Sequence, residues 1–245
     1  MIKVKNLQSK GLLDPVIEEA LGLLENCGNA TEIAELHAVC SDVMFRKGQY
    51  NDAVYHGEQS IEADEAFGPG HMHLGWALYW LGLNERARTH LAKAVELNPD
   101  EAEASYRLGS LLANALGRPD EAEECFSKCV ELDPKRALAW QQRGLVRWNR
   151  GDSRGAEEDY RRGARAGDAW CGYILEYNGF PLETAEEVMA LADDCWLQNQ
   201  RDRSVELMRD ALNRGFGSPE KTLEAQLKLA DSLSAMKLSE QALDE

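Results

Sequence analysis

The order of apolar and polar residues divides this 245-residue chain into short helices that follow one another in pairs. The pattern returns about every 34 residues, because Gly48 and Ala53 recur as Gly82 and Ala87. Two later copies follow, Gly117 with Ala122 and Gly151 with Ala156. Repetition at this period indicates a stack of small helical repeats, none of which can bury its apolar face alone. We therefore expect an all-α fold.

Turn residues set the expected boundaries of the repeats. Asp14 and Pro15 begin a helix that Gly28 ends, and this helix belongs to a degenerate N-terminal repeat or cap over residues 1–33. Four regular repeats follow, over residues 34–67, 68–101, 102–136 and 137–168.

The regular repeats resemble the tetratricopeptide repeat (TPR). The residues that mark the fourth repeat are Trp140, Gly144, Ala156 and Tyr160, and related sets mark the second and third. Gly144 and Ala156 are small enough to let two helices approach closely, while Trp140 or Tyr160 fills the space between them. The resemblance implies a right-handed superhelical solenoid of antiparallel helix pairs, with about six to seven repeats.

The pattern changes after Asp168. A short irregular helix and a turn are expected as an insertion over 169–183, before the pattern returns over 184–245. That last segment is expected to hold one degenerate repeat plus a partial repeat or C-terminal cap. The partial repeat begins near Leu223 and stops barely into its second helix, so the chain is either capped there or part of a longer protein.

Composition restricts the class of protein. With 43 acidic and 27 basic residues the net charge is −16, which disfavours nucleic acid and anionic membrane surfaces as partners. No apolar run approaches the roughly 20 residues of a membrane span, so no membrane insertion is expected. The six cysteines lack a framework spacing and the start of the chain lacks a secretory signal, which favours reduced thiols and a cytoplasmic protein.

The TPR resemblance implies that the first helices of successive repeats line a concave groove for a peptide. The groove residues that it implies are Phe45, Met72, His73, Trp76, Tyr79, Trp80, Tyr106, Arg107, Asn114, Gln141, Trp148 and Asn149. The TPR clamp for a terminal carboxylate needs Lys and Asn where this chain has Ala38 and Asp42, so an acidic C-terminal tail is disfavoured. Rings beside amides suit an extended or helical peptide instead. The alternative is that this aromatic stripe only packs against neighbouring helices.

Arginines of the fourth repeat form a second candidate surface. Arg143, Arg147 and Arg150 step along one side of its first helix. They are expected either to contact an acidic segment of a partner or to pair with acids of the chain itself. The intramolecular candidates are Glu157, Glu158, Asp159 and the acids after Asp168.

No catalytic or metal-binding arrangement stands out. His71, His73 and His90 lack a convincing third and fourth ligand, and no phosphate-binding glycine loop is present. We therefore expect a non-catalytic protein-interaction scaffold or adaptor that binds a protein or peptide and needs no cofactor. Two alternatives stay open: the substrate-recruiting TPR region of a larger enzyme truncated at residue 245, and a self-assembling TPR protein.

Overall fold

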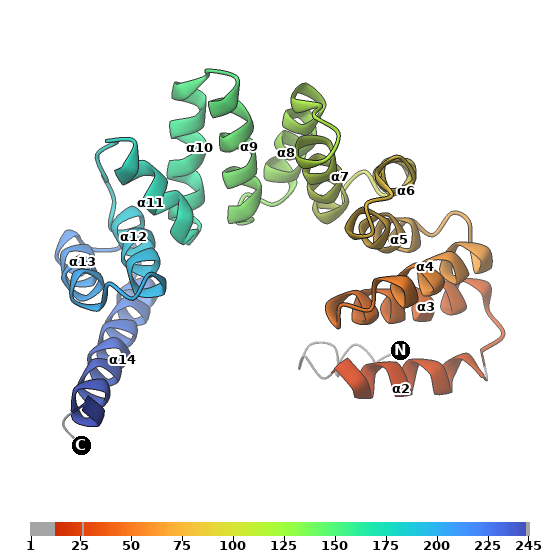
Figure 1. Ribbon diagram of the computed structural model, residues 1–245, viewed down its shortest axis with the longest axis horizontal. Coiled ribbons are helices and arrows are strands. Elements are labelled where there is room, and N and C mark those ends of the chain that lie inside the picture. Colours follow the sequence, from red (N-terminus) through yellow and green to blue (C-terminus); the bar gives the residue numbers. More distant parts are fainter. Residues whose placement is uncertain (1–12, 26, 244–245) are drawn as a thin grey trace. The chain divides into compact units, whose positions relative to one another are not determined.

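The computed structural model describes residues 13–25 and 27–243, with side chains described as far as Lys237, and all regular structure in that part of the chain is helical. Figure 1 shows these helices in sequence. They are α2 (Leu13–Leu24), α3 (Ala30–Arg46), α4 (Tyr50–Ala63), α5 (Gly68–Trp80), α6 (Asn84–Leu97), α7 (Ala102–Asn114), α8 (Pro119–Leu132), α9 (Ala137–Asn149), α10 (Ser153–Arg165), α11 (Ala169–Tyr177), α12 (Ala185–Leu197), α13 (Arg201–Arg214) and α14 (Pro219–Leu243). The predicted all-α fold is therefore confirmed.

The chain divides into two compact units, with the boundary between Leu132 and Asp133. The N-terminal unit contains α2 to α8 and the C-terminal unit contains α9 to α14. Inside the N-terminal unit, α3/α4, α5/α6 and α7/α8 pack as antiparallel hairpins, and each hairpin packs on the next. Inside the C-terminal unit, α9/α10 and α12/α13 do the same. These hairpins confirm the predicted solenoid of helix pairs.

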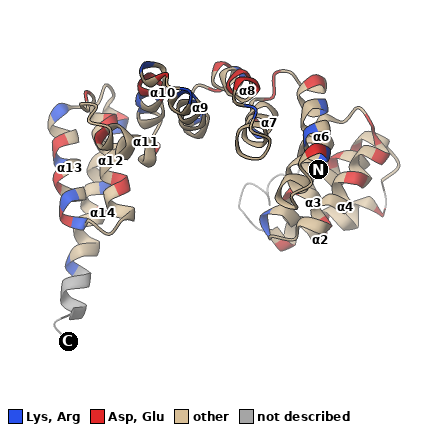
Figure 2. Ribbon diagram, turned by 45° about the horizontal axis from the view of Figure 1, so that its top comes forward, with Lys and Arg blue, Asp and Glu red and all other residues tan. Residues whose placement is uncertain are grey.

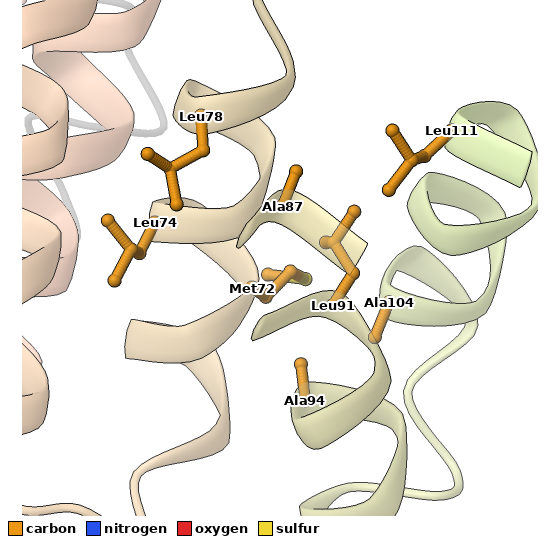
Figure 3. Packing of buried hydrophobic residues seen from close by; sticks show 8 residues of the cluster. All are labelled: Met72, Leu74, Leu78, Ala87, Leu91, Ala94, Ala104 and Leu111. Atoms are coloured by element: carbon orange, nitrogen blue, oxygen red, sulfur yellow. The ribbon is translucent and has the colours of Figure 1, made fainter. Parts of the chain in front are cut away.

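The core of the N-terminal unit is built by side chains from successive helices. Leu74 and Leu78 of α5, Leu91 of α6 and Leu111 of α7 are completely buried in one cluster. Figure 3 shows how these leucines, with small alanines between them, fill the space between neighbouring helices. Each buried leucine contributes about 1.5–3 kcal/mol. Because the cluster spans more than one hairpin, the hairpins stabilise one another.

A residue in the left-handed conformation links the two helices of a hairpin. Gly48 and Gly82 have φ of 76°, and Gly151 has φ of 85°. Glycine is favoured there because it has no Cβ to clash with the following carbonyl. Asn199, with φ of 61°, occupies the same place between α12 and α13, and asparagine is among the few other residues that tolerate this conformation. The turn therefore places α12/α13 among the repeats although its glycine is missing.

The close approach of α9 and α10 depends on Gly144. A Cβ at Gly144 would lie 2.7 Å from Cε1 of Tyr160, whose side chain is 1% exposed. Trp140 is also buried, and its Nε1 donates a hydrogen bond of 2.8 Å to the carbonyl oxygen of Pro134. The expectation that a small residue permits the contact while large rings fill the remaining space is confirmed here.

The predicted short helix after Asp168 is α11, and it is an integral part of the C-terminal unit. It packs against α10 on one side and α12 on the other, and its Cys171 and Leu175 are completely buried. A Cβ at Gly172 would lie 2.5 Å from the backbone nitrogen of Leu191 and 2.8 Å from the carbonyl carbon of Ala190. Only a glycine lets α11 approach the backbone of α12 this closely.

The expected partial repeat or C-terminal cap is a single helix, α14, without a second helix near residue 238 in the described part of the chain. The reason is visible in the residues, since no glycine or proline follows Pro219 to end the helix. Leu223 and Leu227 are exposed on α14, by 57% and 58%. Self-association of the chain stays a prediction.

Candidate functional site

Five aromatic rings gather at one end of α3 and α5 in the N-terminal unit. We call them the aromatic surface; its members are Phe45, Tyr50, Trp76, Tyr79 and Trp80. The centroid of the Trp80 ring lies 5.9 Å from that of Phe45, 5.8 Å from Tyr50, 6.4 Å from Trp76 and 6.2 Å from Tyr79. Trp80 is nevertheless 53% exposed, whereas the other four rings are half-buried. The surface therefore presents one indole on a support of four rings.

Local structure explains why the rings meet. Phe45 and Trp80 lie at the C-terminal ends of α3 and α5, and these helices pack against each other. The left-handed turn at Gly48 reverses the chain and places Tyr50, the first residue of α4, 5.5 Å from Phe45 between ring centroids. Our sequence analysis missed Tyr50. Tyr50 lies two residues after Gly48, the glycine that recurs in each repeat. This position could have indicated that Tyr50 begins the second helix of the hairpin, beside the end of the first helix.

Arg107 connects the aromatic surface to α7. Its guanidinium lies 5.3 Å from the ring centroid of Trp76, and its Nε donates a hydrogen bond of 2.5 Å to Glu103. A cation over an indole face is attracted by the ring quadrupole, so Arg107 fixes Trp76 as part of the support. Arg107 is thus already engaged by a ring and a carboxylate.

The other predicted groove residues of the N-terminal unit are dispersed. Met72 is 8% exposed and belongs to the core cluster, so little of its surface is available to a partner. The Tyr106 ring packs 6.0 Å from that of Phe126 in its own hairpin. His73 is half-buried, and Asn114 is exposed at the end of α7. The structure brings together Phe45 with the three rings of α5, and leaves these four residues outside that cluster.

Two histidine pairs occur in the N-terminal unit, 34 residues apart in the sequence. Nδ1 of His37 is 3.0 Å from Nδ1 of His56, and Nδ1 of His71 is 3.1 Å from Nδ1 of His90. His71 Nε2 lies 3.0 Å from the carbonyl oxygen of Glu65, which can only accept a hydrogen bond. The proton of neutral His71 therefore sits on Nε2, and its Nδ1 accepts from His90. Burial, followed by the charge of the paired histidine, lowers the pKa of His56 and His90.

His73 is the histidine most resistant to protonation. Burial, followed by the charge of Arg107, lowers its pKa to about 3. Its Nδ1 lies 3.9 Å from Asp42, which is too long for a hydrogen bond, so this carboxylate does not offset the burial.

Lowering the pH from about 7.5 to about 5.5 is expected to destabilise the N-terminal unit. Histidines with lowered pKa values stay neutral in the folded chain but take up protons in the unfolded chain, so the stabilisation is complete above the ordinary pKa and is lost below it. His73 alone accounts for about 1.4 kcal/mol over this interval. Urea denaturation at the two pH values measures the effect. His73→Gln should show a smaller loss, and an equal loss in both proteins would contradict this explanation.

In the C-terminal unit, the predicted groove residues lie on α9. Gln141 is half-buried, Asn149 is exposed, and Trp148 is 37% exposed. Among the described residues of the C-terminal unit, Trp148 is not part of an aromatic cluster like the one around Trp80. We therefore describe these residues as a separate part of the predicted groove.

The arginines of α9 are engaged within their own hairpin. Arg143 makes two hydrogen bonds with Asp159 of α10, of 2.9 and 2.7 Å, and Arg147 adds a third of 3.0 Å. Asp159 is completely buried. The guanidinium groups of Arg143 and Arg162 each lie 4.9 Å from the ring centroid of Trp140. Of the two alternatives for Arg143 and Arg147, the structure has the intramolecular pairing; contact with an acidic partner, including through Arg150, stays a prediction.

A second ion-pair network joins α10 to the start of α12. Glu187 is completely buried and accepts hydrogen bonds from Arg161 at 3.1 Å, from Arg165 at 2.9 Å and from the backbone of Glu183 at 2.7 Å. In Figure 2 the ribbon of α10 carries blue segments for its basic residues and red segments for its acidic residues. Arg161 and Arg165 of this repeat therefore hold α10 against the start of α12.

Among the described residues, a metal site, a reactive thiol and a membrane-spanning helix would each require a particular arrangement of side chains. No three His, Cys, Asp or Glu side chains there are placed to hold a metal ion, and the six cysteines are free thiols. Burial raises the pKa of the Cys40 and Cys125 thiols to about 11, which makes them poor nucleophiles. None of the described helices is both long and apolar enough to cross a membrane.

Comparisons with known proteins agree with this architecture. The family model described as tetratricopeptide repeat matches residues 73–137. Superkiller complex protein 3 of Homo sapiens is 27% identical over 139 residues, which cover 54% of this chain but 9% of the relative. This chain therefore spans a small part of that protein's length.

Solved structures give matches over more of the chain. YrrB, described as a TPR protein with an unusual peptide-binding site, is 25% identical with a TM-score of 0.54, over 71% of this chain and 88% of YrrB. PilF of Pseudomonas aeruginosa is 15% identical with a TM-score of 0.59, over 92% of this chain and 94% of PilF. The family model therefore marks residues 73–137 as tetratricopeptide-repeat sequence, and the solved structures show that the described helix hairpins have the fold of such repeats.

Proposed function

We propose that this chain is a non-catalytic protein-interaction scaffold whose aromatic surface binds a peptide segment of a partner protein. The observation that carries the proposal is the Trp80 indole, which is 53% exposed although four rings pack around it. A large ring that is already ordered loses little conformational entropy on binding, and such rings are frequent energetic centres of interfaces. The described peptide-binding site of YrrB supports the proposal by analogy.

The chemistry of the surface indicates what part of a peptide it holds. Helix α5 carries no Asp, Glu, Lys or Arg, and Arg107 of α7 already contacts Trp76 and Glu103. The surface therefore suits apolar or aromatic side chains of a segment within a chain better than a terminal carboxylate. One or two anchors supply about 1.5–6 kcal/mol before the cost of ordering the peptide is subtracted, so binding through these anchors alone is weaker than micromolar.

Trp80→Ala is expected to weaken binding of such a peptide by about tenfold or more, because it removes the exposed anchor and leaves the supporting rings. Peptides from a display library are first selected for binding to the whole chain. Their affinities for the chain and its variants are then measured by calorimetry. Trp80 is a better target than Trp76, because Trp76 is half-buried between other rings and Arg107 and its loss would disturb the fold.

Tyr55→Ala is the matched control. Tyr55 is 57% exposed on α4, where its ring contacts His56 of the same helix. Its removal should change the affinity by less than about twofold. Peptides that bind the Trp80 and Tyr55 variants with the same affinity would refute the proposed site, and melting curves of both variants separate loss of binding from loss of fold.

A further inference from the structure

A cavity of about 360 Å³ opens between α11, α12 and the start of α13 in the C-terminal unit. Trp170 and Tyr173 of α11 line one part of it, and Asp194 of α12 lines another with the amides of Gln198 and Gln200. Tyr173 is 38% exposed and Trp170 is half-buried, so both rings are anchored in the fold and reach the cavity. This volume lies at the lower end of the range of ligand pockets and is large enough to admit one long side chain.

Asp194 is a carboxylate without a cation. Among the described residues no Lys or Arg lies within ion-pair distance of it. Arg203 also lines the cavity, but its guanidinium is bonded to Glu176 and to Gln200. Partial burial raises the pKa of Asp194, and the hydrogen bond from Gln198 opposes this only in part. The carboxylate has therefore lost water without gaining an opposite charge.

In a second cavity of the C-terminal unit, the acidic residues are paired with lysines of the chain itself. This cavity has a volume of about 310 Å³ and is lined by Glu186 and Asp193, which pair with Lys221 at 3.0 Å and with Lys228 at 2.6 Å. The two consecutive aspartates of α12 thus differ: Asp193 has a partner inside the chain, and Asp194 faces a cavity with aromatic walls.

We propose that this cavity binds a lysine or arginine side chain of a partner polypeptide. The cation would pair with the Asp194 carboxylate, while Trp170 and Tyr173 attract it through their ring faces and cover its aliphatic stem. The net charge of −16 favours approach of a basic segment. The site lies in the C-terminal unit and does not depend on the aromatic surface of the N-terminal unit.

The experiment titrates the whole chain, labelled at the tryptophan indole nitrogens, with three blocked tripeptides. Their central residues are lysine, arginine and norleucine, and the last matches the lysine stem without its charge. The lysine and arginine peptides should shift the Trp170 indole signal in a saturable way, and norleucine should not. Asp194→Asn should weaken the binding by about tenfold, because it removes the charge and keeps the shape. Asp193→Asn, next to it, should change it by less than about twofold.

Three results would overturn the proposal. They are an equal shift with norleucine, equal affinities in the Asp194 and Asp193 variants, and absence of a shift at Trp170 with any of the peptides. The comparison of peptides uses the unmodified chain, so it decides the matter even if a variant folds poorly. A further variant, Tyr173→Leu, keeps an apolar wall but removes the ring face, and should weaken binding of the lysine peptide.

Discussion

Asp159→Ala is expected to destabilise the C-terminal unit by about 3–5 kcal/mol, or to unfold it. Asp159 is completely buried and receives hydrogen bonds from both Arg143 and Arg147. Removing the carboxylate takes away the buried charge to which both arginines bond, and breaking a buried ion pair in this way costs far more than the pair itself contributes. Hydrogen exchange of the amides of α9 and α10, with α3 and α4 as an internal reference, measures this loss.

Glu158→Ala is the matched control for this prediction. Glu158 is the preceding residue of α10 and pairs with Arg162 at 2.5 Å, but both side chains of that pair are largely exposed, by 61% and 47%. An exposed pair contributes about 0–1 kcal/mol, so exchange in α9 and α10 should change little. Similar protection in the two variants would show that the Asp159 network does not hold this hairpin together.

Gly172→Ala has the second large expected effect, a loss of about 3 kcal/mol in the C-terminal unit. The added Cβ would meet the backbone of Leu191 and Ala190, which cannot turn aside as a side chain can. The helices α11 and α12 must separate, and such overpacking typically costs about 1–3 kcal/mol, with more where backbone is in the way. Thermal unfolding followed by circular dichroism measures the loss.

Gly22→Ala supplies the contrast. Gly22 lies in α2, and a Cβ there would meet nothing within 4 Å. Alanine is the better helix former by about 0.8–1.0 kcal/mol, so this variant should be more stable than the original chain. If both substitutions changed stability in the same direction, close approach of α11 and α12 would not explain why residue 172 is a glycine.

The sequence predicts the helix hairpins because their turns need particular residues. Gly48 and its counterparts mark positions where the backbone is left-handed, and these positions repeat with the period of the fold. The TPR resemblance implied that Phe45 and Trp80 belong to the groove, and the structure shows that they lie at the ends of α3 and α5. Where the marker changes, as at Asn199, only the backbone angle reveals the equivalence.

The sequence does not predict which side chains of different helices come into contact, because this depends on the distances between the helices. Met72 occupies a groove position in the repeat, but its side chain turns into the core, where it is 8% exposed. The pairing of Arg143 with Asp159 was one of two alternatives, because spacing alone does not say whether a buried acid faces a given arginine. The cavity at Asp194 could not be predicted, because α11 has no counterpart in a regular repeat.

The most direct test of the central claim is the indole spectrum of the whole chain during a titration with a display-selected peptide. The chain has six tryptophans, and each gives its own indole N–H signal: Trp76, Trp80, Trp140, Trp148, Trp170 and Trp196. We predict the largest shift at Trp80, a smaller one at Trp76, and none at Trp140, which is 6% exposed inside its hairpin. A peptide that binds with micromolar affinity and leaves Trp80 and Trp76 unmoved would contradict the account.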